Sequence, residues 1–186
     1  LKTTVCRDYI HPELEWAKDS RLILLTAHRR ENIGDPMHHM FRAIRRIVDE
    51  HSDIKVIYPI HMNPAVRKAA DEELGNDNRI HIIEPLDVLD FHNFLARSYL
   101  ILTDSGGIQE EAPSLGKPVL VMRDTTERPE GIAAGTLKLV GTSEKTIYAE
   151  FKRLLENDAA YEEMSKASNP YGDGHACERI ANALIG

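Results

Sequence analysis

Short apolar runs alternate with amphipathic helical segments along this chain, and this alternation constrains the fold more than any other feature. The segment 35–50 places Met37, Phe41 and Ile44 at helical spacing, and it follows an apolar run at 22–26. Apolar runs that are separated by helices predict parallel strands buried on both faces. The predicted strands cover residues 22–26, 55–60, 80–83, 99–104, 119–122 and 137–140. The predicted helices cover residues 35–50, 65–74, 88–97, 108–115, 144–156, 159–167 and 175–184. We therefore expect one α/β domain with a doubly wound parallel sheet.

Polar residues follow the predicted strands at their carboxyl ends. These polar segments are residues 28–32, 61–63, 84–86, 104–107 and 123–130. In a doubly wound sheet, ligands bind beyond the carboxyl ends of the strands. We therefore expect a binding site at this edge, built from segments that lie far apart in the sequence.

Ser105, Gly106 and Gly107 form a turn of small residues between the fourth predicted strand and the next helix. Such a turn gathers free backbone N–H groups at the positive end of a helix dipole, which holds phosphate without a lysine. Glu111 lies about one helical turn further on, where its carboxylate could accept hydrogen bonds from two neighbouring sugar hydroxyls. An ordinary strand-to-helix turn with solvated charges is the alternative. The charged run that begins at Arg123 returns to the same edge and favours a site.

His28, Arg29, Arg30 and Glu31 directly follow the first predicted strand. Guanidinium groups bind anionic oxygens in a fork geometry. A histidine beside a leaving phosphate could donate a hydrogen bond or a proton as charge develops there. A solvated loop is the alternative, and the position at the end of a buried strand favours the site.

His61 and Phe91 are less decided by the sequence. His61 ends the second strand, where a capping role and a core role fit equally well. Phe91 lies on the helix after the third strand and fits the core better than a base-stacking role.

Composition and missing motifs exclude several other classes of protein. The net charge of −7, from 23 basic and 30 acidic residues, argues against broad nucleic-acid binding. Cys6 and Cys177 give neither a disulfide framework nor a metal pattern, so we expect a reducing compartment and no metal. No apolar run approaches the roughly 20 residues that span a bilayer, and no signal peptide is visible, so we expect no membrane association.

Standard nucleotide fingerprints are also missing. The chain has no G-x-G-x-x-G, and Gly116-Lys117 is followed by Pro118, so there is no P-loop. Taken alone, the residues indicate an α/β domain that binds a phosphorylated ligand, a nucleotide. The chain begins at Leu1 without an initiator Met, and we expect it to be a piece of a longer protein.

Three runs together resemble the non-hydrolysing UDP-N-acetylglucosamine 2-epimerases. They are residues 26–32 (TAHRREN), 103–111 (TDSGGIQEE) and 123–130 (RDTTERPE). The resemblance covers essentially the whole chain in order and spacing, and it matches only the C-terminal part of that family's protein. It implies that residues 1–186 are a C-terminal, UDP-binding, Rossmann-like domain. This domain would be one half of a GT-B-type two-domain fold from which the N-terminal domain is absent.

The resemblance implies a role for each residue near the small-residue turn. Ser105, Gly106 and Gly107 would hold the diphosphate of UDP, and Glu111 would bind the ribose hydroxyls. Arg128 would contact the diphosphate region of the nucleotide.

It implies further roles at the ends of the first three strands. Leu86 and Phe91 would line the uracil pocket, and His28 would sit at the phosphate and sugar and assist the departure of UDP. Bacterial members bind a second UDP-GlcNAc as an activator, and the matching positions here are Arg29 and His61.

The implied reaction interconverts UDP-GlcNAc and UDP-ManNAc without a cofactor. UDP is eliminated to leave a glucal-type intermediate and is added again after protonation on the other face of C2. The implied partners are UDP-GlcNAc or UDP, the N-terminal domain of the same protein and, at full length, a second copy in a homodimer. The implied setting is cell-surface polysaccharide biosynthesis in the cytoplasm. Because the family's acid and base carboxylates belong to the N-terminal domain, we expect the chain alone to bind UDP weakly and not to epimerise.

Three alternatives remain at this stage. A GT-B glycosyltransferase would share the fold but would use an acceptor, and the runs at 26–32 and 123–130 argue against it. A hydrolysing 2-epimerase would keep the elimination but let water capture the sugar. A non-catalytic UDP-sugar sensor would bind ligand without exchanging the C2 hydrogen for solvent deuterium.

Overall fold

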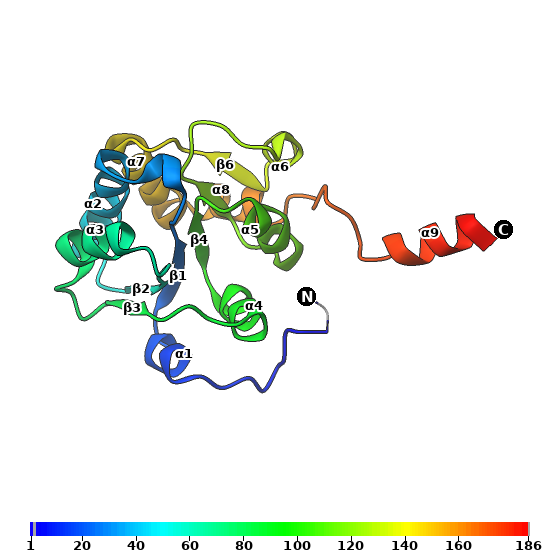
Figure 1. Cartoon of the computed structure of the whole chain (residues 1–186), viewed down its shortest axis with the longest axis horizontal. Coiled ribbons are helices and arrows are strands. Elements are labelled where there is room, and N and C mark those ends of the chain that lie inside the picture. Colours follow the sequence, from blue (N-terminus) through cyan, green and yellow to red (C-terminus); the bar gives the residue numbers. More distant parts are fainter. Residues whose placement is uncertain (2, 186) are drawn as a thin grey trace.

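The computed structural model describes residues 1 and 3–185, and within them a parallel sheet forms the centre of the molecule (Figure 1). Its six strands have the order β3-β2-β1-β4-β5-β6. The strands are β1 (Arg21–Thr26), β2 (Ile54–Pro59), β3 (Ile80–Ile83), β4 (Leu100–Thr103), β5 (Val119–Val121) and β6 (Leu137–Leu139). The α-helices are α1 (Pro12–Ala17), α2 (Asp35–Glu50), α3 (Pro64–Leu74), α4 (Val88–Arg97), α5 (Gly106–Glu111), α6 (Pro129–Ala134), α7 (Glu144–Glu156), α8 (Asp158–Ser165) and α9 (Ala176–Ile185). Two short 3-10 helices are η1 (Arg30–Asn32) and η2 (Ala112–Leu115).

The central strand β1 shows why the sheet is covered on both faces. Ile23 pairs in register with Val56 of β2 and with Leu100 of β4, and all pairings in the sheet are parallel. Ile23 and Leu25 pack with α2, α3, α7 and α8. Leu22 and Leu24 pack with α1, α4 and α5. Successive side chains of a strand point to opposite faces, so a strand that is apolar throughout fills two cores. The predicted doubly wound, Rossmann-like sheet is confirmed.

The boundaries differ from the prediction where the chain turns tightly. The predicted helix 108–115 begins earlier, at Gly106, and its last turn is the 3-10 helix η2. Pro113 lacks a backbone N–H and cannot continue the α-helical ladder, and Gly116 ends the element with φ of 66°. Helices η1 and α6 lie in segments that were predicted only as polar returns to the sheet edge.

The two ends of the chain are held differently. Residues 3–11 run along α4, where the Cys6 N–H donates to Asn93 Oδ1 at 2.9 Å and Arg97 Nη2 donates to the Cys6 carbonyl at 2.8 Å. In contrast, α9 lies away from the sheet in Figure 1 and has no buried residue. No helix in the described part of the chain is long and apolar enough to cross a membrane.

Candidate functional site

The site lies at the carboxyl ends of β1 and β4, where the order of the sheet reverses. Thr26 of β1 and Thr103 of β4 are paired in register, and their hydroxyl oxygens are 2.6 Å apart in the buried floor of this junction. After β1 the chain passes to α2 on one face, and after β4 it passes to α5 on the other. This divergence opens a crevice between the two connections, and doubly wound folds bind their ligands there.

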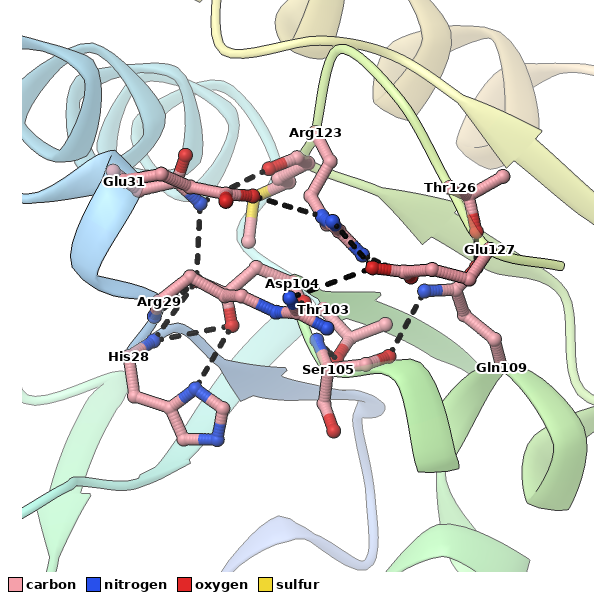
Figure 2. A network of polar contacts seen from close by, with 12 residues as sticks. His28, Arg29, Glu31, Thr103, Asp104, Ser105, Gln109, Arg123, Thr126 and Glu127 are labelled. Carbon is pink, nitrogen blue, oxygen red and sulfur yellow. Dashed lines mark hydrogen bonds and ion pairs between the residues drawn. The ribbon is translucent and has the colours of Figure 1, made fainter.

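Asp104, the first residue after β4, is fully buried and fixes the segment that follows β1 (Figure 2). Its Oδ2 accepts hydrogen bonds from the backbone N–H groups of His28 at 2.9 Å and Arg29 at 2.8 Å. Oδ2 also accepts a hydrogen bond from Asn32 Nδ2 at 3.1 Å. Oδ1 lies 3.2 Å from His28 Nδ1, which leaves Nε2 as the ring nitrogen that does not face Asp104.

The electrostatics of Asp104 follow from these contacts. Burial acts to raise the pKa of its carboxyl group, but the hydrogen bonds from His28 and Arg29 outweigh burial and lower the pKa below its ordinary value. Asp104 is therefore ionised at neutral pH.

The N-terminal end of α5 is open. The Ser105 N–H donates to Thr103 Oγ1 at 2.9 Å, and the Ser105 side chain makes no capping hydrogen bond. Neither Gly106 nor Gly107 has a positive φ. Among the described residues, a Cβ at Gly107 would meet no atom within 4 Å, and a Cβ at Gly106 would meet only Arg29 Nη2, at 3.6 Å. Neither the backbone nor the chain's own packing requires glycine here, so the bare surface is free for a ligand to approach the first N–H groups of the helix.

Arg123 ties the loop after β5 to the loop after β1. It is almost fully buried, and its two Nη atoms donate to the Glu127 carboxylate at 2.6 and 2.9 Å. Its Nε donates to Glu31 Oε1 at 3.1 Å. The hydrogen bonds from Arg123 lower the pKa of Glu127 to about 2, and Arg29 Nη1 lies 3.6 Å from the same carboxylate.

A second set of contacts ties the same loop to α5. Gln109 Nε2 donates to the Ser105 carbonyl at 3.0 Å, and Thr126 Oγ1 donates to Gln109 Oε1 at 2.5 Å (Figure 2). Arg128 occupies the N-cap position of α6 without a capping hydrogen bond from its side chain, and it forms an ion pair with Glu110. The structure thus brings Arg128 against α5 but engages its side chain with Glu110.

A pocket of about 230 Å³ opens beside α5. Leu86, Phe91, His28 and His61 are among its lining residues, together with Ile108 of α5. The His28 and His61 rings meet edge to face with their centroids 5.6 Å apart. The same pocket is therefore lined by residues that the resemblance assigns to UDP (Leu86, Phe91 and His28) and by one that it assigns to the activator UDP-GlcNAc (His61).

Glu111 is three residues after Ile108 on α5, which puts it on the same side of the helix as this pocket-lining residue, and its carboxylate faces His92 of α4. Its side chain is 39% exposed, and its Oε2 lies 3.7 Å from His92 Nε2. The carboxylate is therefore accessible to a ligand and has a neighbour in the protein.

The sequence did not single out Asp104, Arg123, Glu127, Gln109 or Thr126 as functional. Each of them fell in a segment that the predicted strand ends pointed to, except Gln109 on α5. Their positions after predicted strands indicated that they lie near the site. Their hydrogen-bond partners could not be predicted, because these contacts join segments that are distant in the sequence. Within residues 1 and 3–185 no group of three or more His, Cys, Asp or Glu side chains could hold a metal ion.

Comparisons with known proteins agree with this geometry. The family model described as UDP-N-acetylglucosamine 2-epimerase matches residues 2–185. The UDP-N-acetylglucosamine 2-epimerase of Bacillus subtilis (strain 168) is 62% identical over 185 residues, which are 100% of this chain and 49% of that protein.

Two solved structures are similar over nearly the same region. The S. aureus MnaA–UDP co-structure has a TM-score of 0.95 at 56% identity and covers 98% of this chain and 50% of its own. The Neisseria meningitidis UDP-GlcNAc 2-epimerase bound to UDP-GlcNAc has a TM-score of 0.86 at 46% identity, covering 90% of this chain and 45% of its own. The chain thus spans about half the length of the relatives it matches. On the sequence match and the shared fold, this chain belongs to the UDP-N-acetylglucosamine 2-epimerase family.

Proposed function

We propose that this chain is the UDP-binding half of an enzyme that interconverts UDP-GlcNAc and UDP-ManNAc. The observation that carries the proposal is the junction of an open helix N-terminus with an apolar pocket, since Gly106 begins α5 and Ile108 lines the pocket. A nucleoside diphosphate needs both features side by side. The S. aureus relative binds UDP and the N. meningitidis relative binds UDP-GlcNAc, which supports the same ligand here.

The proposed binding mode runs along α5. The diphosphate meets the N–H groups of Gly106 and Gly107 and the Ser105 hydroxyl, where the helix dipole favours negative charge. The ribose hydroxyls reach the Glu111 carboxylate about one turn further along the helix. The start of α5, the pocket beside it and the Glu111 carboxylate thus offer the phosphate, the base and the sugar of one nucleotide a partner each around a single helix.

The uracil lies against Leu86 and Phe91 in this proposal. Both residues line the pocket of about 230 Å³ beside α5 and are only partly buried. A ring face that is left uncovered in an apolar pocket offers a base a surface on which to stack.

His28 assists the departure of UDP in the proposed reaction. As the C1–O bond breaks, its electron pair moves onto the β-phosphate oxygen, and the proton on C2 passes to a base in the half of the protein beyond this chain. His28 donates through Nε2 to the developing charge, while Asp104 holds Nδ1 and stabilises the imidazolium. Arg29 and Arg128 add positive charge at the same edge. Re-addition of UDP after protonation on the opposite face of C2 completes the epimerisation.

The activator site is proposed at Arg29 and His61. The edge-to-face contact of His61 with His28 supports a coupling, because a ligand on His61 would bear directly on the ring that assists the leaving group. For the full-length protein we propose a cytoplasmic homodimer whose N-terminal half supplies the acid and the base.

Calorimetric titration of UDP tests the proposal. We expect the chain to bind UDP weakly and Glu111→Ala to weaken binding on the order of tenfold, since a hydrogen bond to a charged group contributes about 1.5–3 kcal/mol. Glu163→Ala, on the exposed side of α8, is the matched control and should leave the affinity unchanged. UDP binding that is insensitive to Glu111→Ala contradicts the assignment of the ribose to Glu111. Detectable UDP-ManNAc formation by this chain contradicts the proposal that the N-terminal half supplies the acid and the base.

A further inference from the structure

His92 is a buried histidine that faces the carboxylate to which the proposed function assigns the ribose. It follows Phe91 on α4, its side chain is 10% exposed, and its Nε2 lies 3.7 Å from Glu111 Oε2. This distance is an electrostatic contact, slightly longer than a hydrogen bond. The same turn of α4 thus lines the pocket with Phe91 and faces Glu111 with His92.

The other ring nitrogen of His92 is engaged by the N-terminal arm, residues 3–11. Thr4 Oγ1 lies 2.8 Å from His92 Nδ1 and 3.2 Å from the Leu1 carbonyl. A hydroxyl has one proton and therefore donates to one of these acceptors at a time. The nearer one is Nδ1, and when Nδ1 accepts, the proton of a neutral imidazole sits on Nε2 and points its positive end at Glu111.

Asn93 fixes Thr4 in the position that this contact needs. Its Nδ2 donates to the Thr4 carbonyl at 2.9 Å, and its Oδ1 accepts from the Cys6 N–H at 2.9 Å. The Asn93 residue is 1% exposed, so both bonds are shielded from water. A buried side chain that uses its donor and its acceptor on one short segment holds that segment in a single register.

We propose that His92 is a positioning residue for Glu111 and that Thr4 sets its tautomer. Without a neighbour, a glutamate side chain that is 39% exposed samples many rotamers, and restricting it to one rotamer on binding a sugar costs conformational entropy. With Nε2–H beside it, the carboxylate is held where two ribose hydroxyls can reach it. The relay Thr4–His92–Glu111 therefore sets the preference for ribose over 2′-deoxyribose, and this inference rests on the proposed binding of UDP.

The first test needs no ligand. Nitrogen-15 NMR of the histidine rings in the free chain reports the tautomer of each neutral imidazole. We expect His92 to carry its proton on Nε2 and Thr4→Val to shift it toward Nδ1, whereas Thr3→Val, at the exposed neighbouring position, leaves it unchanged. An Nδ1–H tautomer in the unmodified chain overturns the proposal.

The second test compares UDP with 2′-deoxy-UDP by calorimetry. We expect His92→Ala to weaken UDP binding about tenfold and to leave 2′-deoxy-UDP within about twofold, so that the preference for ribose collapses. His92→Gln, which returns an N–H donor, should restore part of it, and the exposed control His39→Ala should have no effect. A purely structural role for His92 would weaken both ligands together or lower the melting temperature alone, and either result overturns the proposal.

The two proposals fail in different ways. If the unmodified chain binds UDP more tightly than 2′-deoxy-UDP, and this preference depends on Glu111 but not on His92, the proposed relay is wrong and the proposed nucleotide site stands. If the chain binds no UDP at all, the proposed function is wrong for this chain, and the tautomer measurement still decides whether Thr4 and His92 orient Glu111.

Discussion

His28 Nδ1 lies 3.2 Å from Oδ1 of Asp104, a carboxylate that is fully buried at the end of β4. The same carboxylate accepts the backbone N–H groups of His28 and Arg29, so it fixes both the ring and the loop that carries it. One side chain thereby connects the stability of the sheet junction to the orientation of a residue proposed to act on the leaving group.

Asp104→Asn should destabilise the chain strongly. The substitution places an amide N–H₂ against backbone donors, and leaving buried hydrogen-bonding groups unpaired costs about 1–3 kcal/mol per group. We expect a fall in the free energy of unfolding of roughly 2–4 kcal/mol, measured by urea denaturation at neutral pH. The matched control Asp124→Asn, on the exposed side of the next loop, should change it little.

The same pair of proteins gives a pH test. Because the pKa of Asp104 is lower in the folded chain, its contribution is present above the unfolded value of about 3.9 and is lost as pH falls through the folded value. The difference in stability between the unmodified chain and Asp104→Asn should therefore shrink as pH falls below about 4. A difference that stays constant from neutral to acidic pH would show that Asp104 is not ionised in the folded chain.

Gly107→Ala should separate stability from binding. Since its Cβ would meet no described atom within 4 Å and its φ is not positive, we expect the free energy of unfolding to stay level or rise by about 0.4–1 kcal/mol. UDP affinity should fall at least tenfold, because the methyl group occupies the approach to the helix N–H groups. Thermal unfolding and calorimetry on one sample measure both quantities.

Gly116→Ala is the contrasting control for that substitution. Gly116 has φ of 66°, so an alanine there is strained and should lower the stability by about 1 kcal/mol. UDP affinity measured well below the melting temperature should not change. If the Gly107→Ala variant unfolds, or if it binds UDP as tightly as the unmodified chain, the proposal that Gly107 leaves room for the diphosphate is wrong.

Arg123→Lys should raise the pKa of the Glu127 carboxyl group. Two guanidinium hydrogen bonds lower this pKa to about 2, and an ammonium group cannot reproduce the fork. The stabilising effect of the pair is present above the ordinary value of about 4.3 and is lost as pH falls toward the folded value. Carbon-13 NMR of the carboxyl groups should show the Glu127 titration moving upward, while Arg153→Lys leaves it in place.

Phe91→Ala should weaken UDP far more than pyrophosphate. Loss of a stacking surface costs about 1–3 kcal/mol per base, which corresponds to roughly fivefold to 150-fold in affinity. Pyrophosphate carries no base to stack on Phe91 and should bind as before. Competition between UDP and pyrophosphate, measured by calorimetry, compares the two affinities. An equal loss of affinity for both ligands would show that the uracil does not stack on Phe91.

The fold was predictable because its signals are local. The apolar run that became β1 lies within one strand, and the helical spacing of Met37, Phe41 and Ile44 lies within about two turns of one helix. The change from strand to helix near Ser105 was predictable for the same reason, although the helix begins at Gly106 and not at Ile108. The parallel order followed from helices placed between strands.

The contacts that organise the site were not predictable, because they join distant segments. His28 and Asp104 are 76 residues apart, and Thr4 and His92 are 88 apart. Periodicity carries no information about such partners. Helix α6 was missed because Arg128 and Pro129 belong to a charged run. In the structure Pro129 begins the helix, and Gly131 lies close to Leu137 of β6.

A crystal structure of this chain with UDP tests the central claim most directly. We predict electron density for the diphosphate at the N–H groups of Gly106 and Gly107, the uracil between Leu86 and Phe91, and both ribose hydroxyls at Glu111. Density for UDP at any other edge of the sheet, or a diphosphate that does not contact the start of α5, would contradict the account.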